Sequence, residues 1–399
     1  MLLIPKDIHL NQRINYTKIK IKQSLQNTQV HHDIFKDSEI EDTIDRILEN
    51  HEIKLNDIIC LLESQEIQRL GLVGNSIRED MFGKNVTFIN NIILNYTNVC
   101  VTYCKFCAFY RPPGHEESYT VSKEEILNRV IFAKANYNIK QVLFQGGHNP
   151  KLNTEYFEDI FRTLKAKCPD VAIHGLSASE VDMISRVDRT SPLEVLERLQ
   201  NAGLESLPGA GAEILVDEVK DVISPLKISS QTWLDIMEKA HSIGIKSSAT
   251  MMYGTVESIE QRARHILKIA DLQSKTNGFM AFIPWSFEPN KTEIQGSGLV
   301  KHPMGGFELL KMISVSRIVF KDLIDHLQSS WLTNGIGMAQ LAIYHGSDDF
   351  GGTLIGEEVV SATGARSTEL LSKNIMTAIK AMGYKPAERN NSYDIIKQY

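Results

Sequence analysis

Three of the five cysteines in this chain lie within eight residues, and their spacing constrains the fold and the function more than any other feature. Cys100, Cys104 and Cys107 form the pattern Cys-x3-Cys-x2-Cys. One loop with this spacing can carry three thiolates to three corners of a cubane [4Fe–4S] cluster. Because no fourth cysteine lies nearby in the sequence, one iron atom would be left to bind another molecule.

Zinc is the alternative occupant of such a loop. A structural zinc ion takes four ligands, and His115 or the distant Cys168 could complete the set. A second Cys-x2-Cys or Cys-His pair would normally supply the other half of that site, and the sequence has none. A disulfide framework is disfavoured, because a chain of 399 residues can bury a large core without covalent staples.

The composition predicts a soluble, cytoplasmic protein. The apolar run after Met1 is too short for a signal peptide, and no apolar stretch approaches the roughly 18 residues of a membrane helix, so we expect no membrane partner. A net charge of −6 and a pI near 6.1 argue against a nucleic-acid partner, because phosphate binding requires a basic surface.

Strand-like and helix-like segments alternate from residue 86 to about residue 345. This rhythm predicts an α/β fold, a parallel (β/α) barrel of TIM type with function on the loops that follow the strands. A doubly wound open sheet is disfavoured, because polar, glycine-rich strand ends recur after nearly every strand. The strands are expected at 86–89, 92–94, 141–147, 171–176, 204–207, 245–251, 279–283 and near Trp331.

Three regions are expected along the chain. Residues 1–38 form an N-terminal extension without an assigned role. Residues 39–85 show apolar residues at helical intervals and are expected to pack on the barrel as two or three amphipathic helices. Residues 86–399 are expected to form the barrel and its C-terminal helices, the last of them near 368–382.

The cysteine spacing, with Phe106 just before the last cysteine, resembles the cluster loop of the radical S-adenosylmethionine (SAM) superfamily. The resemblance implies a [4Fe–4S] cluster held by the three cysteines, and SAM bound to the open iron. It also implies that Gly146 and Gly147 let the backbone approach the SAM amino group, since a side chain would block that approach. A strand-ending turn is the simpler reading of this glycine pair.

Further cofactor contacts follow from the same resemblance. Glu213 is expected to accept hydrogen bonds from the SAM ribose, although it could be an ordinary carboxylate at a helix start. Tyr253 and Gly254 are expected to border the adenine, and Phe106 to stack near it. Ser177 is a weaker candidate, because it could simply cap the next helix.

Several longer segments resemble one branch of the superfamily, the dehypoxanthine futalosine cyclases of menaquinone synthesis. These segments span 107–111, 145–150, 207–215, 249–254, 282–285 and 348–353. The resemblance implies that a 5′-deoxyadenosyl radical takes the C4′ hydrogen of the substrate ribose, and that the ring then closes on the benzoate portion. Residues 355–358 and Ala210 depart from the pattern of this branch, and residues 1–38 match nothing in it.

Ring closure requires a proton acceptor, and reduction of the cluster requires an electron donor such as flavodoxin or ferredoxin. The catalytic candidates on strand-end loops are His148, Glu213, Asp348 and Asp349, with Glu288 as a further carboxylate. Aminofutalosine synthase and the tyrosine-using subunit of deazaflavin chromophore synthase share the cluster and the barrel, so the cysteines do not separate them. A metal-binding or electron-transfer protein without radical chemistry is the remaining alternative.

Overall fold

The computed structural model describes residues 38–49, 52–300, 302–365 and 369–399. Its centre is a curved sheet of seven parallel strands in the order β2-β3-β4-β5-β6-β7-β8. Neighbouring strands follow one another in the chain, as expected of a parallel barrel. These strands are β2 (Asn91–Asn95), β3 (Gln141–Gln145), β4 (Ala172–Gly175), β5 (Leu204–Leu207), β6 (Lys246–Tyr253), β7 (Phe279–Ser286) and β8 (His326–Leu327).

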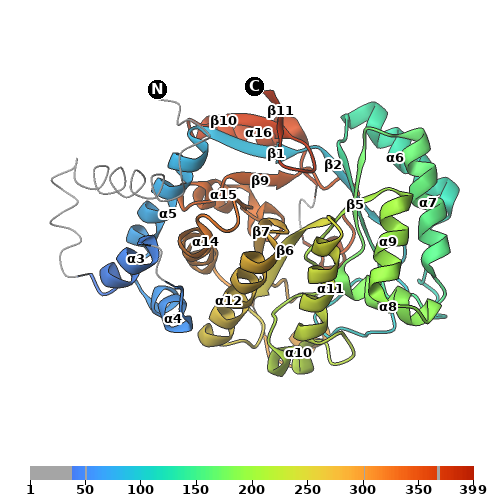
Figure 1. Cartoon of the computed structure of the whole chain (residues 1–399), viewed down its shortest axis with the longest axis horizontal. Coiled ribbons are helices and arrows are strands. Elements are labelled where there is room, and N and C mark those ends of the chain that lie inside the picture. The colour runs from blue at the N-terminus through green and yellow to red at the C-terminus, as the bar shows by residue number, and fades with distance from the viewer. Residues whose placement is uncertain (1–37, 50–51, 301, 366–368) are drawn as a thin grey trace.

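Helices connect these strands and form an outer layer on the sheet (Figure 1). Their starts follow from local sequence: Ser122 Oγ accepts the Glu125 N–H, and Asn153 and Ser191 cap two later helices in the same way. The helices are α6 (Lys123–Tyr137), α7 (Thr154–Lys167), α8 (Ala178–Asp188), α9 (Pro192–Ala202), α10 (Asp217–Ile223), α11 (Ser230–Ser242), α12 (Ile259–Thr276), α13 (Glu293–Gly296), α14 (Gly306–Phe320) and α15 (Trp331–Tyr344).

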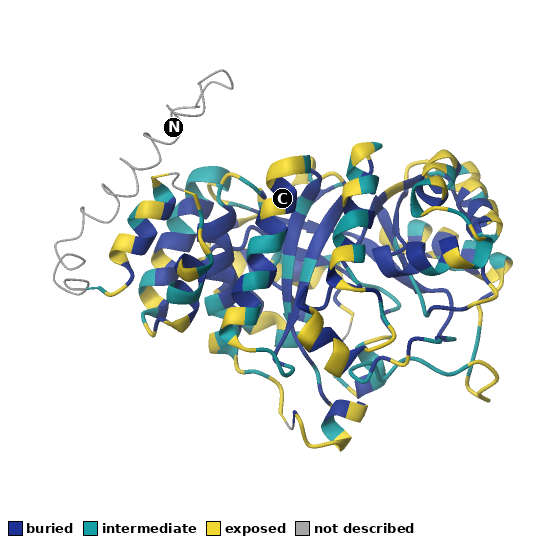
Figure 2. Cartoon of the chain, turned by 60° about the horizontal axis from the view of Figure 1, so that its bottom comes forward, coloured by how far each residue is buried: buried dark blue, intermediate teal, exposed yellow. Residues whose placement is uncertain are grey.

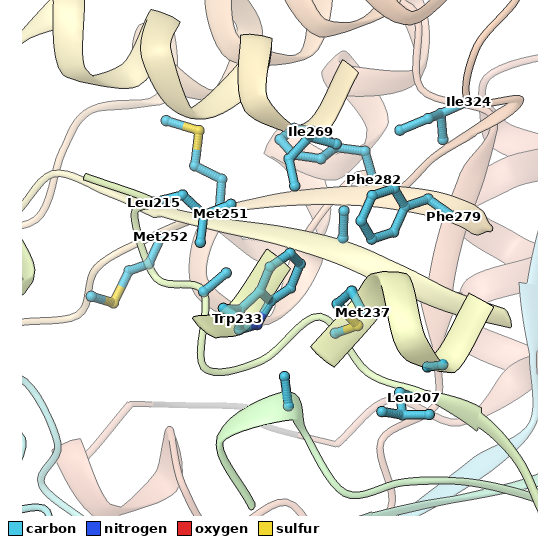
Figure 3. Close-up of a cluster of buried hydrophobic side chains, with 14 of the residues drawn as sticks. Leu207, Leu215, Trp233, Met237, Met251, Met252, Ile269, Phe279, Phe282 and Ile324 are labelled. Carbon is cyan, nitrogen blue, oxygen red and sulfur yellow. The ribbon is translucent and has the colours of Figure 1, made fainter. Parts of the chain in front are cut away.

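The core lies between the sheet and this helical layer. Figure 2 shows buried strands surrounded by helices whose outer faces are exposed. Trp233 of α11 stacks on Phe279 of β7, and Met251 and Met252 belong to the same apolar cluster (Figure 3). Burying one large apolar side chain stabilises the fold by about 1.5–3 kcal/mol. The methionine pair therefore has a packing role.

A second sheet, in the order β11-β10-β1-β9, lies beside the first. It contains β1 (Asn85–Ile89), β9 (Asp349–Gly352), β10 (Lys385–Arg389) and β11 (Ile395–Gln398). The Ser329 N–H, just after β8, donates to Asp349 O at 2.9 Å, and the Ile93 N–H of β2 donates to Ile355 O at 2.8 Å. The segment that begins with β9 therefore links both edges of the seven-stranded sheet, which is a partial TIM barrel.

Within residues 38–82 as the structure describes them, three helices precede the barrel: α3 (Glu41–Leu48), α4 (Leu55–Glu63) and α5 (Ile67–Phe82). Helix α5 lies against α14, and α4 packs on α12 and α14. The sequence periodicity predicted helices in this region. The expected extension 1–38 lies outside the described residues except for Ser38. Within the part of the chain that the structure describes, no helix is long and apolar enough to cross a membrane.

The end of the chain differs from the sequence-based expectation at two places. The strand expected near Trp331 is wrong, because Trp331 begins α15 and the strand is the earlier segment β8. The C-terminal region contains α16 (Ser372–Ala381), a short 3₁₀ turn at Ser361–Thr363 and, unexpectedly, the antiparallel pair of β10 and β11. The turn between β10 and β11 reaches the barrel interior, where Asn391 accepts a hydrogen bond from Gln141 and donates one to Ser206.

Candidate active site

The cysteine loop follows β2 and opens onto a cavity of about 370 Å³. Cys100, Cys104 and Cys107 all line this cavity. The Cys100 N–H donates to Arg111 O at 2.9 Å, and the Cys107 N–H donates to Cys104 O at 3.0 Å, so backbone bonds fix the loop. Burial raises the pKa of the Cys104 thiol to about 12 and also raises that of Cys107. Deprotonation of these buried thiols therefore costs free energy, and a bound cation would have to offset that cost.

The geometry of the loop bears on the choice between one metal ion and a cluster. Among the described residues, no three Cys, His, Asp or Glu side chains converge closely enough to hold a single metal ion. Neither His115 nor Cys168, the fourth zinc ligands considered above, lines the cavity.

Gly146 and Gly147 follow β3 and also line the cavity. A Cβ atom on Gly146 would lie 2.7 Å from the Tyr96 ring, and one on Gly147 would lie 2.3 Å from Val99 O. Both contacts are too short, so glycine is needed here for packing against the cysteine loop. The Gly147 N–H donates to Thr97 O at 2.8 Å and joins the two strand ends.

Ser177 and Glu180 form a capping box at the start of α8. Ser177 therefore has the capping role considered above, while it also lines the cavity. Glu180 accepts hydrogen bonds from Tyr96 Oη at 2.8 Å and from the Gly146 N–H at 2.9 Å. This buried carboxylate positions the glycine segment, and sequence reasoning missed it.

Glu213 lies in the cavity wall and forms a buried charge cluster with two lysines. Lys227 Nζ is 2.7 Å from Glu213 Oε1, and Lys220 Nζ is 3.6 Å from Oε2. Burial alone would raise the pKa of Glu213, but Lys227 and Lys220 hold it below its ordinary value. Lys227 also lies 5.5 Å from the centre of the Phe106 ring, which lines the same cavity.

His148 follows the glycine pair and is almost fully buried in the cavity wall. Its Nε2 lies 3.2 Å from Ser179 Oγ. Burial, together with the positive charge of Lys227, lowers the pKa of His148 to about 3. The imidazole is therefore neutral at neutral pH.

Tyr253 and Gly254 end β6 but do not line the cavity. The Tyr253 ring is fully buried, and the Arg262 guanidinium lies 5.6 Å from its centre. The Gly254 N–H donates to Glu257 Oε1 at 2.6 Å, and Gly254 has a φ of 92°, which favours glycine. The structure therefore places both residues in the packing behind the cavity wall.

Asp348 and Asp349 are also away from the cavity lining, although they were expected on a substrate loop. Asp348 accepts from Arg317 Nη2 at 2.6 Å and lies 2.7 Å from His326 Nδ1. Asp349 begins β9 and pairs with Arg389 at 2.8 Å. Both carboxylates are buried in ion pairs, and neither lines the cavity.

One remaining candidate and one missed residue complete the description of the site. Glu288 accepts from Asn290 and is absent from the cavity lining. Lys227 was missed, because a lone lysine after a helix carries no motif. Only the structure reveals it, as a largely enclosed ammonium beside a buried carboxylate and the cysteine loop.

The fold and the site define a class of protein, an α/β barrel with a cluster-binding loop after its first strand. Comparison with known proteins agrees with this class. The radical SAM superfamily model matches residues 94–269, and the CofH/MqnC C-terminal region model matches residues 276–398.

The chain resembles curated proteins along most of its length. It is 38% identical over 362 residues to the cyclic dehypoxanthine futalosine synthase of Halalkalibacterium halodurans, covering 90% of this chain and 96% of that protein. It is 37% identical to the synthase of the same name from Streptomyces coelicolor, covering 90% and 89%. It is 36% identical to the 5-amino-6-(D-ribitylamino)uracil–L-tyrosine 4-hydroxyphenyl transferase of Methanocaldococcus jannaschii, covering 87% and 98%.

Solved structures support the fold. Methylornithine synthase aligns with a TM-score of 0.65 at 20% identity, covering 86% of this chain and 97% of that one. The hydrogenase maturase HydG from Carboxydothermus hydrogenoformans aligns with a TM-score of 0.69 at 14% identity, covering 97% and 87%. The chain belongs to the radical SAM superfamily and, within it, to the futalosine-synthase family, and it is an enzyme.

Enzymes of this superfamily use a [4Fe–4S] cluster and SAM. The site fits both groups. Three soft thiolates face one cavity, which suits the iron atoms of a cluster, and the ionised Glu213 carboxylate lies in the wall of the same cavity.

Proposed function

We propose that this enzyme cyclises dehypoxanthine futalosine to cyclic dehypoxanthine futalosine, a step of menaquinone synthesis. The observation that carries the proposal is the similarity to two synthases with this activity in their names, at 38% and 37% identity over 90% of the chain. The transferases that share the fold are 33–36% identical. The cavity, about 370 Å³ in volume and mostly apolar, suits a small aromatic substrate.

Cys100, Cys104 and Cys107 would hold the cluster. When bound, the reduced cluster and SAM supply a 5′-deoxyadenosyl radical, with an external one-electron donor such as flavodoxin or ferredoxin. The protein itself encloses and orients the reactants: the cavity walls exclude water, and the bound reactants lie close together.

Glu213 and Lys227 would orient the cofactor. The pKa of Glu213 is depressed, so this carboxylate stays ionised and is suited to accept a hydrogen bond from a ribose hydroxyl. A carboxylate held ionised by two lysines is a weak base. Glu213 therefore suits binding better than proton removal.

His148 remains as the proposed proton acceptor. It lines the cavity as a neutral imidazole, so one ring nitrogen has a free lone pair. Its pKa of about 3 makes His148 a weak base as well, and it is preferred to Glu213 because the Glu213 carboxylate is already engaged by Lys227 and Lys220. A proton accepted by His148 leaves readily, for example through Ser179 Oγ at 3.2 Å. Asp348 and Asp349 are not part of this proposal, because their buried ion pairs lie outside the cavity lining.

The second candidate function is the transfer of a tyrosine-derived hydroxyphenyl group to a diaminouracil derivative. The archaeal transferases support it, with 36% identity over 87% of this chain for the enzyme from Methanocaldococcus jannaschii. Both reactions use the same cluster and SAM, so substrate identity separates them.

The test is turnover of each substrate by the reconstituted, reduced enzyme under anaerobic conditions. The cyclase proposal predicts 5′-deoxyadenosine together with a product lighter than dehypoxanthine futalosine by a pair of hydrogens, measured by mass spectrometry. Turnover of tyrosine with the ribitylaminouracil, and not of dehypoxanthine futalosine, would establish the transferase activity instead.

A further inference from the structure

His174 lies in the cavity wall and has no role in the mechanism above. It belongs to β4, where it is next to Leu143 of β3 and Ser206 of β5 in the strand register. Its Nδ1 is 2.6 Å from Ser206 Oγ. Its Nε2 has no hydrogen-bond partner among the described residues and is not one of the fully enclosed polar atoms. This nitrogen is therefore available to a ligand in the cavity.

A backbone group sets the direction of the hydrogen bonds that lead to His174. The Leu354 N–H donates to Asn91 Oδ1 at 2.9 Å, and a backbone N–H can only donate. Asn91 Nδ2 is consequently the end that donates to Gln141 Oε1, at 3.0 Å. Gln141 Nε2 then donates to Asn391 Oδ1 at 2.7 Å. Each of the three amides has its orientation fixed by the one before it.

The hydrogen bonds run in the same direction from Asn391 to the imidazole of His174. Asn391 Nδ2 donates to Ser206 Oγ at 3.0 Å. The single Ser206 hydroxyl proton has two acceptors in reach, His174 Nδ1 at 2.6 Å and Asn391 Oδ1 at 3.2 Å. Asn391 Oδ1 also accepts from Gln141, and the shorter distance of 2.6 Å favours His174 Nδ1 as the acceptor of the hydroxyl proton. An imidazole that accepts at Nδ1 carries its proton on Nε2.

The ring is neutral, so it has only this one proton to donate. Burial, with the nearby charge of Arg389, lowers the pKa of His174 to about 3. Near His174 the cavity wall includes the apolar side chains of Ile93, Leu143 and Ile283. An N–H donor in an apolar wall fixes the orientation of a ligand that has an oxygen acceptor at that point.

We propose that His174 is a substrate-binding residue whose imidazole is locked as the Nε2–H tautomer and donates to an oxygen atom of the substrate inside the cavity. Ser206, Asn391, Gln141 and Asn91 are positioning residues that act through this ring. Asn391 belongs to the turn between β10 and β11, so the C-terminal hairpin contributes to the site from the opposite end of the chain. The identity of the substrate rests on the function proposed above, whereas the tautomer does not.

The tautomer is measured by nuclear magnetic resonance on the full-length, cluster-reconstituted enzyme labelled with ¹⁵N-histidine. The chain has twelve histidines, and comparison with a His174→Gln sample identifies the signals of His174. At neutral pH we expect an unprotonated Nδ1 and a protonated Nε2. A protonated Nδ1 in the wild-type enzyme would overturn the proposal.

Ser206→Ala tests the positioning chain by the same measurement. Without the Ser206 hydroxyl, His174 Nδ1 no longer accepts the hydrogen bond that fixes the tautomer, so a population with a protonated Nδ1 should appear. An unchanged tautomer in this variant would contradict the role of Ser206.

Two variants of His174 test the contact with substrate. A glutamine amide nitrogen reaches the position of Nε2, whereas an asparagine amide reaches only that of Nδ1. His174→Asn should therefore raise the KM for dehypoxanthine futalosine about ten- to a hundredfold, the loss expected for one hydrogen bond to a charged or strongly polar oxygen. His174→Gln should stay within about threefold of the wild type in KM, and both should keep their cluster.

Equal increases in KM for the two variants would overturn the proposed hydrogen bond between His174 Nε2 and the substrate. If the wild-type enzyme does not process dehypoxanthine futalosine at all, the proposed function fails, while the tautomer measurement still decides the state of His174. The same pair of variants is then measured with tyrosine as the substrate.

Discussion

Lys227 Nζ lies 2.7 Å from Glu213 Oε1 in the wall of the cavity that the cysteine loop also lines, where Glu213 is buried and the Lys227 side chain is only 12% exposed. Glu213 adopts a φ of 43°, a conformation that few residues other than glycine adopt. The surrounding structure therefore holds this carboxylate in place at some conformational cost, as is common where a side chain has a binding role. The pair links the strand end after β5 with the segment that leads to α11.

Glu213→Gln should weaken SAM binding while the cluster is retained. The amide keeps the size of the side chain but removes the charge that pairs with Lys227, and it replaces one acceptor oxygen with a donor. We expect an increase of about tenfold or more in the Kd for SAM, measured by equilibrium binding to the reconstituted enzyme. Glu205→Gln, at an exposed carboxylate on β5, is the matched control. Equal affinity of both variants would rule out a cofactor contact by Glu213.

Gly147→Ala should disturb the cysteine loop. Its Cβ would lie 2.3 Å from Val99 O, so the strand end or the loop must shift. We expect a lower iron content after reconstitution and a loss of stability. Gly337→Ala is the control, because its Cβ meets no atom within 4 Å and alanine favours the helix. Full iron content in Gly147→Ala would show that the loop tolerates this shift.

Asp348→Asn should destabilise the fold without a specific effect on turnover. The substitution leaves the buried Arg317 guanidinium with an uncompensated charge, which costs about 3–5 kcal/mol of unfolding free energy. Denaturant unfolding measures this loss, and Asp159→Asn in an exposed pair with Lys123 should cost about 0–1 kcal/mol. A stable Asp348→Asn protein that binds SAM but does not turn over substrate would return Asp348 to the list of catalytic candidates.

The buried histidines predict a loss of stability in mild acid. Burial lowers the pKa of His265 to about 3, whereas a histidine in the unfolded chain has a pKa near 6.5. Between these values the unfolded chain binds the extra proton, so the unfolding free energy falls as the pH falls. The slope is about 1.4 kcal/mol per pH unit for each such imidazole.

His265→Asn isolates one of these contributions. His265 lies in the core, where its Nδ1 accepts from the Leu215 N–H at 2.9 Å, and an asparagine oxygen can replace that acceptor. The variant should show a shallower dependence of unfolding free energy on pH between about 6.5 and 4 than the wild type, by about 1.4 kcal/mol per pH unit. An unchanged slope would mean that His265 is not held neutral in the folded protein.

Regular alternation made most of the barrel predictable from the sequence. The strand expected at 204–207 is β5, with the same bounds. The C-terminal part of the fold was harder to predict. Strand β9 begins with Asp349 and ends with two glycines, residue types with low strand propensity, and the ion pair of Asp349 with Arg389 from the far end of the chain holds it there.

At Trp331 a strand was expected where the structure has a helix. An aromatic residue in an apolar segment is typical of a strand, but Trp331 begins α15. In the site, the cysteines and the glycine pair carry a local motif. Lys227 and His174 do not, because their roles depend on neighbours that are distant in sequence.

The proposed cyclisation begins with abstraction of the C4′ hydrogen, and a deuterium-labelled substrate reports on this step. The reconstituted, reduced enzyme is given SAM and dehypoxanthine futalosine deuterated at C4′, and the 5′-deoxyadenosine is analysed by mass spectrometry. We expect 5′-deoxyadenosine that carries one deuterium, together with the cyclised product. Unlabelled 5′-deoxyadenosine, formed while the substrate keeps its deuterium, would refute the proposed abstraction.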